Sequence, residues 1–380
     1  MQAKILVAVA TRGCRMSNPQ PHEFAAQPLA NASALPAHRY VGNDAEALDR
    51  RAVFARSWQL AAHRSHLEGV GDHVVTEVAG VPLMIVRGED GELRALHNVC
   101  RHRAGPLALC DGRAAKRLRC HYHGWTYALD GRLLSAPEMD AACDFHVESV
   151  RLPEAHVACW RDLVFVALGD APPLRELLHG IDARIGDAAL AGYALQRRVA
   201  YDIDCDWKIY IDNYLEGYHV PHIHPELNRM LDYRSYVTEL ARWHSLQWSP
   251  LESAGDLYGN GEALYYWIWP NTMLNILPGR LQTNRVLPLP GNRCRVEFDF
   301  YYPPGSDAAE RQQRDLVFSD VVQKEDVAIC EQVQRGLASG SYVAGRLNPK
   351  RESGVHHFHE LLRAAYRAAE DTVNRSATSG

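Results

Sequence analysis

The sequence lacks three features that mark common classes of protein. Its early apolar run, from Ile5 to Ala10, is too short for the core of a signal peptide or for a membrane span. No run of Lys or Arg exceeds two residues and the net charge is −5, which disfavours nucleic acid as a partner. No GxGxxG pattern occurs, so a dinucleotide-binding domain is not indicated. We therefore expect neither a membrane nor a nucleic acid as partner.

The cysteines are few and irregularly spaced. There are nine, an odd number, without the dense spacing of a disulfide-rich secreted protein. This usage indicates a reducing compartment, and we expect a cytoplasmic protein. A second methionine, Met16, opens a polar stretch, and we expect residues 1–15 to be an upstream extension that contributes nothing to the fold.

The length and composition suit two globular domains. The chain has 380 residues, of which 47% are apolar and 23% charged. Short alternating segments punctuated by glycine run from Gly71 to Ala167 and predict a β meander. The GDAPPL segment that follows indicates a boundary near residue 170. We predict an N-terminal extension over 1–40, partly disordered, an all-β domain with an N-terminal helix over 41–170, and a second domain over 171–380.

The second domain has the pattern of an α+β fold. A helical stretch is expected over 173–186, a buried helix over 208–219 and one long helix over 311–338. Between them, aromatic-rich segments from 264 to 302 predict antiparallel strands.

The strongest chemical signal is a pair of short Cys/His motifs. Cys100-x-His102 is followed, after seventeen residues, by Cys120-x2-His123. Two thiolates and two imidazoles on two loops can hold a Rieske [2Fe-2S] centre, with two Cys on one iron and two His on the other. The same four ligands also satisfy a structural zinc site, although their order differs from that of a zinc finger. Cys110, between the motifs, is expected not to be a ligand.

A second signal lies in the segment from Asp212 to His224, which holds two acids and three histidines in thirteen residues. Glu216 and His219 are three apart and would share a helix face, and a proline at position 221 should distort that helix. Two imidazoles and one carboxylate suit a ferrous site with positions left open for O2. Spacing alone does not choose between His222 and His224 as the second imidazole.

The strings NVCRHRAGPLA and CHYHGWTY, with the acid-x2-His-x4-His pattern, resemble the Rieske non-haem iron oxygenases. The resemblance extends from about residue 40 to 362. It implies an all-β Rieske domain and a helix-grip-like catalytic domain with an antiparallel sheet. The cluster ligands it implies are Cys100, His102, Cys120 and His123. For the mononuclear iron it implies His219, His224 and Asp326, with Glu325 as the second choice for the carboxylate.

The resemblance also implies how the two sites cooperate. Members of this family form ring-shaped trimers in which the cluster of one subunit serves the iron of the next. A homotrimer is therefore expected, with His123 of one subunit bonded to Glu216 of its neighbour and Glu216 to His219. Electrons would come from a separate NAD(P)H-dependent reductase, and O2 would be the co-substrate. The reaction would be hydroxylation of a C–H bond or dihydroxylation of a double bond.

The substrate is the least constrained expectation. The resemblance is nearest to the choline, glycine-betaine and carnitine branch, which oxidises a carbon next to a quaternary nitrogen, by hydroxylation or N-demethylation. Aromatic rings suit such a cation, and the candidates are Trp243, Trp248, Tyr258, Tyr265, Tyr266, Trp267 and Trp269. Rings that alternate in strands also form sheet cores. An aromatic-ring-hydroxylating dioxygenase and a non-catalytic Rieske electron carrier are the alternatives. His356, His357 and His359 are expected to serve packing and polar contacts.

Overall fold

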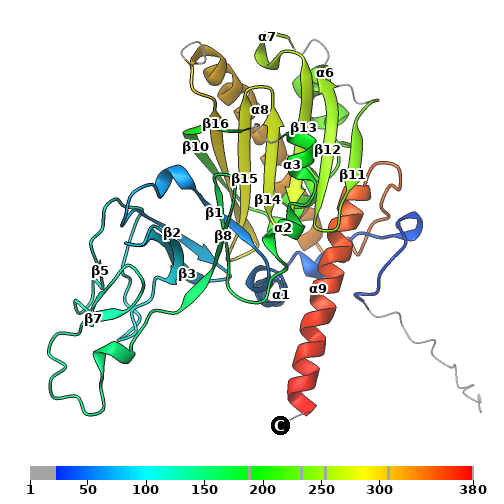
Figure 1. Cartoon of the computed structure of the whole chain (residues 1–380). Helices are drawn as coiled ribbons and strands as arrows, with labels where there is room; N and C mark the ends of the chain where they lie inside the picture. The colour runs from blue at the N-terminus through cyan, green and yellow to red at the C-terminus, as the bar shows by residue number, and fades with distance from the viewer. Residues whose placement is uncertain (1–22, 187–189, 232–233, 252–254, 306–308, 379–380) are drawn as a thin grey trace, which may run out of the picture.

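The computed structural model describes residues 23–186, 190–231, 234–251, 255–305 and 309–378 (Figure 1). Of the expected extension over 1–40, residues 1–22 lie outside this description, and with them the expectation for residues 1–15. Residues 23–40 include two short 3-10 turns, Leu29–Asn31 and Ala37–Arg39. Phe24, Leu35 and Tyr40 from this segment are buried in the core of the second domain.

The first domain is an antiparallel β domain. Its six-stranded sheet has the order β1-β9-β8-β4-β3-β2, and a three-stranded sheet has the order β5-β6-β7. The strands are β1 (Gln59–His63), β2 (His73–Val78), β3 (Val81–Arg87), β4 (Leu93–His97), β5 (Leu118–Arg119), β6 (Thr126–Tyr127), β7 (Leu133–Ser135), β8 (Glu154–Trp160) and β9 (Leu163–Ala167).

Strand β3 shows why this domain can hold two rigid loops. Successive side chains of a strand point to opposite faces. Leu83 and Ile85 enter one apolar cluster, whereas Met84 and Val86 enter another that also contains Cys100 and Cys120. The Cys/His loops therefore rest directly on a packed core. They belong to the β5–β7 side of the domain, at the end away from the second domain (Figure 1).

The second domain is built on a seven-stranded antiparallel sheet with the order β10-β16-β15-β14-β13-β12-β11. The strands are β10 (Ala194–Ile203), β11 (Val237–Leu240), β12 (His244–Leu251), β13 (Gly261–Ile268), β14 (Thr272–Leu277), β15 (Arg280–Leu289) and β16 (Arg293–Tyr302). The α-helices in the described part of the chain are α1 (Asn43–Ala52), α2 (Leu174–Leu177), α3 (Ile181–Ile185), α4 (Trp207–Tyr214), α5 (Val220–Ile223), α6 (Pro225–Met230), α7 (Gly255–Tyr258), α8 (Ala309–Ala338) and α9 (Ser353–Thr378).

Helices α4 and α8 pack on each other and on strands β10, β15 and β16 of this sheet. The long helix α8 crosses the sheet on one face in Figure 1. The expected combination of an all-β domain with a domain of helices and antiparallel sheet is confirmed. None of the described helices is both long enough and apolar enough to cross a membrane.

Two of the expected helices differ from the structure, and the long one is confirmed. The stretch over 173–186 forms α2 and α3, separated at Gly180, which has a φ of +88°. The buried helix over 208–219 ends at Tyr214, so Glu216 and His219 lie in the loop before α5 and share no helix face. The proline at position 221 lies in the first turn of α5, where its missing N–H costs nothing, and distorts no helix interior.

The two domains share cores. Leu60 and Phe165 from the first sheet pack in one apolar cluster with Leu246 and Tyr266 of the second. Helix α1, which the expected division at residue 170 groups with the first domain, contacts α9 and contributes Leu48 to the large core of the second. Asp170 itself is exposed, and the shared cores contain residues on either side of it, such as Phe165 and Leu174.

Candidate functional site

The two Cys/His loops have the same backbone design. In the first, Cys100 N donates to Gly105 O (2.9 Å) and Ala104 N to Cys100 O (3.0 Å). In the second, Cys120 N donates to Trp125 O (2.8 Å) and Gly124 N to Cys120 O (3.1 Å). Each loop is thus closed on itself, and both present a cysteine at the start and a histidine two or three residues later.

The four side chains of these loops converge. The imidazole rings of His102 and His123 lie 4.5 Å apart, and His102 stacks on Trp125 at 4.9 Å. Both thiols are buried, and burial, together with the neighbouring Cys120 thiol, raises the pKa of Cys100. Nδ1 of His102 is buried without a hydrogen-bond partner. Buried thiols side by side and an unsatisfied imidazole nitrogen are what a metal cluster would complete, so the donor set fits a [2Fe-2S] group.

Hydrogen bonds to the thiols come from nearby groups. Tyr127 OH lies 3.2 Å from Cys100 Sγ and accepts the Arg101 amide at 3.0 Å, and the Tyr122 amide donates to Cys120 Sγ at 3.4 Å. Such bonds to ligand sulfur tune the potential of an iron–sulfur cluster. No pattern in the sequence indicated Tyr127. Cys110 is exposed, consistent with its expected exclusion from the ligand set.

His219, His224 and Asp326 come together at the second site. Candidate ligand atoms of the three residues lie within 4.8 Å of one another. Nε2 of His224 is 3.0 Å and Nε2 of His219 is 3.8 Å from Asp326 Oδ1. Both imidazoles come from the two ends of α5, and the carboxylate comes from α8. Two imidazoles and one carboxylate that share a centre fit a mononuclear iron with open positions. The two candidate histidines differ in burial: His222 is exposed, whereas His224 is 1% exposed.

Each imidazole of this site is held by a carboxylate on its other nitrogen. Glu216 Oε1 is 2.6 Å from His219 Nδ1, and Glu325 Oε2 is 2.7 Å from His224 Nδ1. Such contacts fix the tautomer and turn Nε2 towards the metal. Burial lowers the pKa of His224, but Asp326 and Glu325 together raise it above its ordinary value. Glu325, the second choice for the iron-binding carboxylate, thus lies where it can hold His224 in position.

The loop that contains Glu216 is held by the same carboxylate. Glu216 accepts the backbone amides of Tyr218 and His219, the latter at 3.1 Å, at the entrance to α5. Gly217 lies against Tyr236, whose ring would be 2.9 Å from any Cβ at that position. This contact explains why a glycine follows Glu216.

Asp326 also has partners that the sequence did not reveal. Asn213 Nδ2 donates to its Oδ1 at 2.7 Å, and Gln323 Nε2 to its Oδ2 at 3.3 Å. Tyr210 in turn donates to Gln323 at 2.8 Å. The only available signal was the spacing of Gln323 and Asp326 on one helix.

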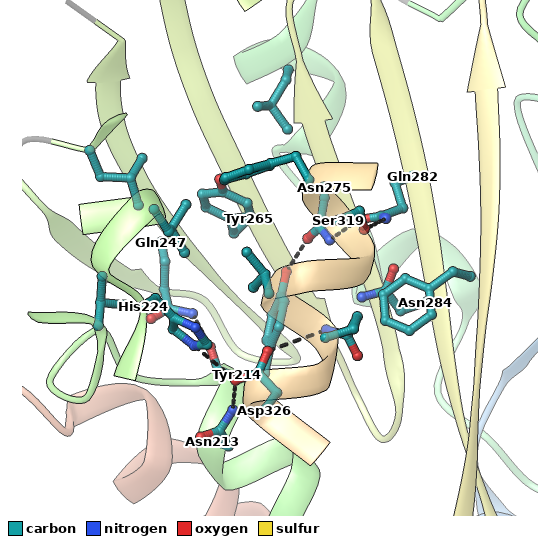
Figure 2. Close-up of a pocket in the computed structure, with 18 of the residues that line it drawn as sticks. Asn213, Tyr214, His224, Gln247, Tyr265, Asn275, Gln282, Asn284, Ser319 and Asp326 are labelled. Carbon is teal, nitrogen blue, oxygen red and sulfur yellow. Dashed lines mark hydrogen bonds and ion pairs between the residues drawn. The ribbon is translucent and has the colours of Figure 1, made fainter. Parts of the chain in front are cut away.

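A cavity of about 130 Å³ opens beside the triad (Figure 2). Tyr214 donates to Asn275 Oδ1 (2.6 Å), Asn275 to Gln282 (2.7 Å) and Gln282 to Ser319 (3.1 Å), so a chain of hydrogen bonds leads along the wall from β14 to α8. Its aromatic lining consists of Tyr210, Tyr214, Tyr236, Tyr258, Tyr265, Phe298 and Phe318. Burial raises the pKa values of Tyr214 and Tyr236 well above the ordinary value of a tyrosine, so both side chains are neutral.

Two of the seven aromatic residues proposed from the sequence, Tyr258 and Tyr265, line this cavity. Trp267 and Trp269 pack in the core of the second domain, and Tyr266, Trp243 and Trp248 in or against the cluster between the sheets. Most of these rings therefore form sheet core, as alternation in strands allows. The late histidines make packing and polar contacts, as expected: His356 bonds Gln27 O and His359 bonds Asp212.

Comparisons with known proteins match both domains of the chain. Residues 57–160 match the Rieske [2Fe-2S] domain, and residues 190–368 match the catalytic domain of the ring-hydroxylating alpha subunit. Choline monooxygenase of Arabidopsis thaliana is 35% identical, over 88% of this chain and 83% of that protein. The chain belongs to the Rieske non-haem iron oxygenase family, and it carries a Rieske cluster domain and a domain for mononuclear iron.

Other similar proteins lie in the same branch. The carnitine monooxygenase oxygenase subunit of Escherichia coli (strain K12) is 29% identical, over 91% of this chain and 97% of that protein. A solved quaternary ammonium Rieske monooxygenase superposes with a TM-score of 0.82 at 27% identity, covering 90% of this chain and 99% of that one. Naphthalene 1,2-dioxygenase, at 18% identity and a TM-score of 0.71, shares the fold. The membership makes the chain an oxygenase, which sets aside the structural zinc protein and the non-catalytic electron carrier.

Proposed function

We propose that this chain is the oxygenase component of a system that oxidises a small quaternary ammonium compound, by hydroxylation or N-demethylation next to the nitrogen. The observation that carries the proposal is a cavity that adjoins the His219/His224/Asp326 triad and is lined with neutral tyrosine rings. Such rings attract a cation without a counter-charge. The choline and carnitine relatives support the same class over the aromatic-ring dioxygenase, whose likeness is one of fold.

Within this proposal, Cys100, His102, Cys120 and His123 hold the cluster, and His219, His224 and Asp326 hold the iron. When bound, the cluster would supply single electrons, and the ferrous ion would supply open coordination positions for O2. The chain's own residues orient the ligands, through Glu216 and Glu325, and enclose the substrate. The rings of the cavity exclude water from the carbon to be oxidised.

Glu216 is proposed as the link for electrons between subunits. Glu216 and His219 line the substrate cavity on one side and an outer groove on the other. His123 is exposed at the tip of its loop, and the loops lie far from the catalytic sheet of their own chain (Figure 1). These positions suit a homotrimer in which His123 of the partner subunit enters the groove and bonds Glu216.

The remaining components follow from the class of enzyme. An oxygenase subunit needs a separate reductase, and we propose NAD(P)H as the source of its electrons. We propose a cytoplasmic location, although the plant relatives are named chloroplastic. The domain division at 41–170 and 171–380 is also a proposal. The matched segments, 57–160 and 190–368, lie on either side of the boundary.

The test begins with anaerobic purification, a visible and EPR spectrum, and an iron count. We expect a red-brown Rieske spectrum and close to three irons per chain. Asp326→Ala should leave the spectrum and remove one iron. Substrate-dependent O2 consumption with a Rieske reductase is then measured for quaternary amines and for aromatic acids. Consumption with the acids alone would overturn the proposed substrate class, and colourless protein without iron would overturn the site assignments.

A further inference from the structure

The cavity contains a buried cation that the chemistry at the iron does not use. Arg280, the first residue of β15, is 5% exposed and lines the cavity. It is the only Lys or Arg among the described residues of the lining. A cavity for a substrate with only a positive charge would gain nothing from it, because like charges in a buried site repel each other.

Asp315 and Tyr258 hold the guanidinium of Arg280 in place. Its Nη1 donates to Asp315 Oδ1 at 2.6 Å and lies 3.3 Å from Tyr258 OH. Asp315, on α8, is 1% exposed and also accepts from Tyr258 and Tyr302. Burial lowers the pKa of Arg280, but Tyr258 and Asp315 raise it, so the guanidinium is charged. Asp315 is not among the lining side chains, whereas Arg280 is.

One donor of this guanidinium is left over. Nε of Arg280 is buried and has no hydrogen-bond partner. A buried donor without a partner costs free energy, and natural proteins leave few of them unless a ligand or water completes the bond. A carboxylate is the natural acceptor for a fixed guanidinium.

The cavity lining also contains groups of the opposite character. Oε1 of Gln247 and Oδ1 of Asn284 are buried in the cavity lining without hydrogen-bond partners. Gln247 is fixed by its amide nitrogen, which donates to Tyr214 O at 2.6 Å. Free amide oxygens and tyrosine rings present partial negative charge, and this suits the polarised methyl groups of a quaternary ammonium.

The spacing of the two ends suits an elongated ligand. Asp315 and Asp326 both lie on α8, eleven positions apart, which is roughly 16 Å along the helix. Asp326 belongs to the iron site and Asp315 positions Arg280, so the cavity extends along α8 from metal to guanidinium. Phe318, Ser319 and Val322 line it between these points.

We infer that Arg280 binds the carboxylate of a zwitterionic substrate whose quaternary ammonium end lies towards the iron. This inference rests on the proposed function and narrows it: betaines with a carboxylate are substrates, and choline-like cations without one are poor ones. The relatives include both kinds, choline and carnitine monooxygenases, and Arg280 places this chain with the second.

The experiment uses three probes of matched shape on the iron-loaded protein, by anaerobic titration calorimetry. The first is 4-trimethylammoniobutanoate, which has both charges. The second is its amide, which keeps only the cation, and the third is 5,5-dimethylhexanoate, which keeps only the carboxylate. Shorter members with one and two methylene groups are included. The variant replaces the buried pair together, Arg280→Gln with Asp315→Asn, so that no unpaired charge remains. The matched control is the exposed pair Arg295→Gln with Asp202→Asn.

The wild type should bind the betaine roughly 10- to 100-fold more tightly than the amide, the range for a hydrogen bond to a charged group. The buried-pair variant should lose that preference and keep the affinity for the amide, which shows that its cavity is intact. The control pair should change neither. Equal binding of betaine and amide by the wild type would overturn the role of Arg280 and leave the proposed function standing.

Two other results separate the claims. If 5,5-dimethylhexanoate binds as tightly as the betaine and depends on Arg280, the carboxylate site stands and the quaternary ammonium class is wrong. If no probe of any length binds, both the proposed substrate class and the inference are wrong.

Discussion

The two metal sites of this chain are supported in different ways. The Cys/His loops are shaped by backbone hydrogen bonds, and within the described residues neither His102 nor His123 is bonded to a carboxylate. At the triad, each histidine is held by a glutamate, and Asp326 by Asn213 and Gln323. The irons of a Rieske cluster have no open coordination position, whereas an iron that must bind O2 keeps some of its coordination positions open. The second site therefore needs side chains to hold the ligands that the metal alone would not fix.

The largest effect should come from removing a cluster ligand. Cys120→Ser should lose the Rieske spectrum and two of the three irons, and turnover should fall below detection because no electrons reach the second site. Iron analysis and EPR measure this, with the exposed Cys110→Ser as the matched control. A variant that kept its Rieske spectrum would break the assignment of the loops.

The next effect should come from the link between the sites. Glu216→Gln should keep both metal centres loaded but lower turnover by roughly 100-fold, since the path between subunits loses its carboxylate. In a single-turnover experiment, the reduced cluster should stay reduced after substrate and O2 are added. Glu226→Gln, an exposed residue of α6, is the control. Normal turnover in the Glu216 variant would contradict the proposed path.

A smaller change should follow at the residue that supports His224. Glu325→Gln should weaken ferrous iron binding at the triad by roughly tenfold, because His224 loses the carboxylate on Nδ1. Competition with an iron chelator measures the affinity, and the cluster spectrum should not change. Glu310→Gln at the start of the same helix serves as control. If iron affinity is unchanged, Glu325 does not stabilise the iron site, and the difference that we describe between the two sites is wrong.

The smallest effect concerns a histidine that binds no metal. Burial, with the nearby His244 and His356, lowers the pKa of His357 to about 4 from 6.5. Below pH 6.5 His357 therefore takes up a proton in the unfolded chain but stays neutral in the folded chain. The free energy of unfolding decreases as the pH is lowered from 6.5 to about 4. Between pH 7.5 and pH 5.5 this proton uptake lowers the free energy of unfolding by about 1 kcal/mol.

His357→Gln should remove that contribution, so its stability should fall less over the same range in urea titrations. His222→Gln, at an exposed position, should behave like the wild type. An identical pH dependence in wild type and His357→Gln would show that this ring is not held neutral by burial.

Much of the fold could be predicted from local patterns. Glycine-punctuated alternation marked the strands of the first domain, and the helical stretch expected over 311–338 forms nearly the full length of α8. Helix ends were less predictable. The pattern over 208–219 is helical throughout, yet α4 stops at Tyr214 because the carboxylate of Glu216 instead bonds the amides that precede α5. That choice depends on contacts that no local pattern records.

The sequence by itself determined the chemistry: Cys-x-His with Cys-x2-His, and Glu-x2-His-x4-His, are ligand sets whose members lie close along the chain. Spacing left open the choice between His222 and His224. The tertiary structure places His224 beside Asp326, about a hundred residues away, with Glu325 on its other nitrogen. It also placed Tyr214 and Arg280 in the cavity and Trp267 in the core. The physical reason is that loop ligands are positioned by neighbours in sequence. A cavity is positioned by the packing of a helix on a sheet, which only the folded chain defines.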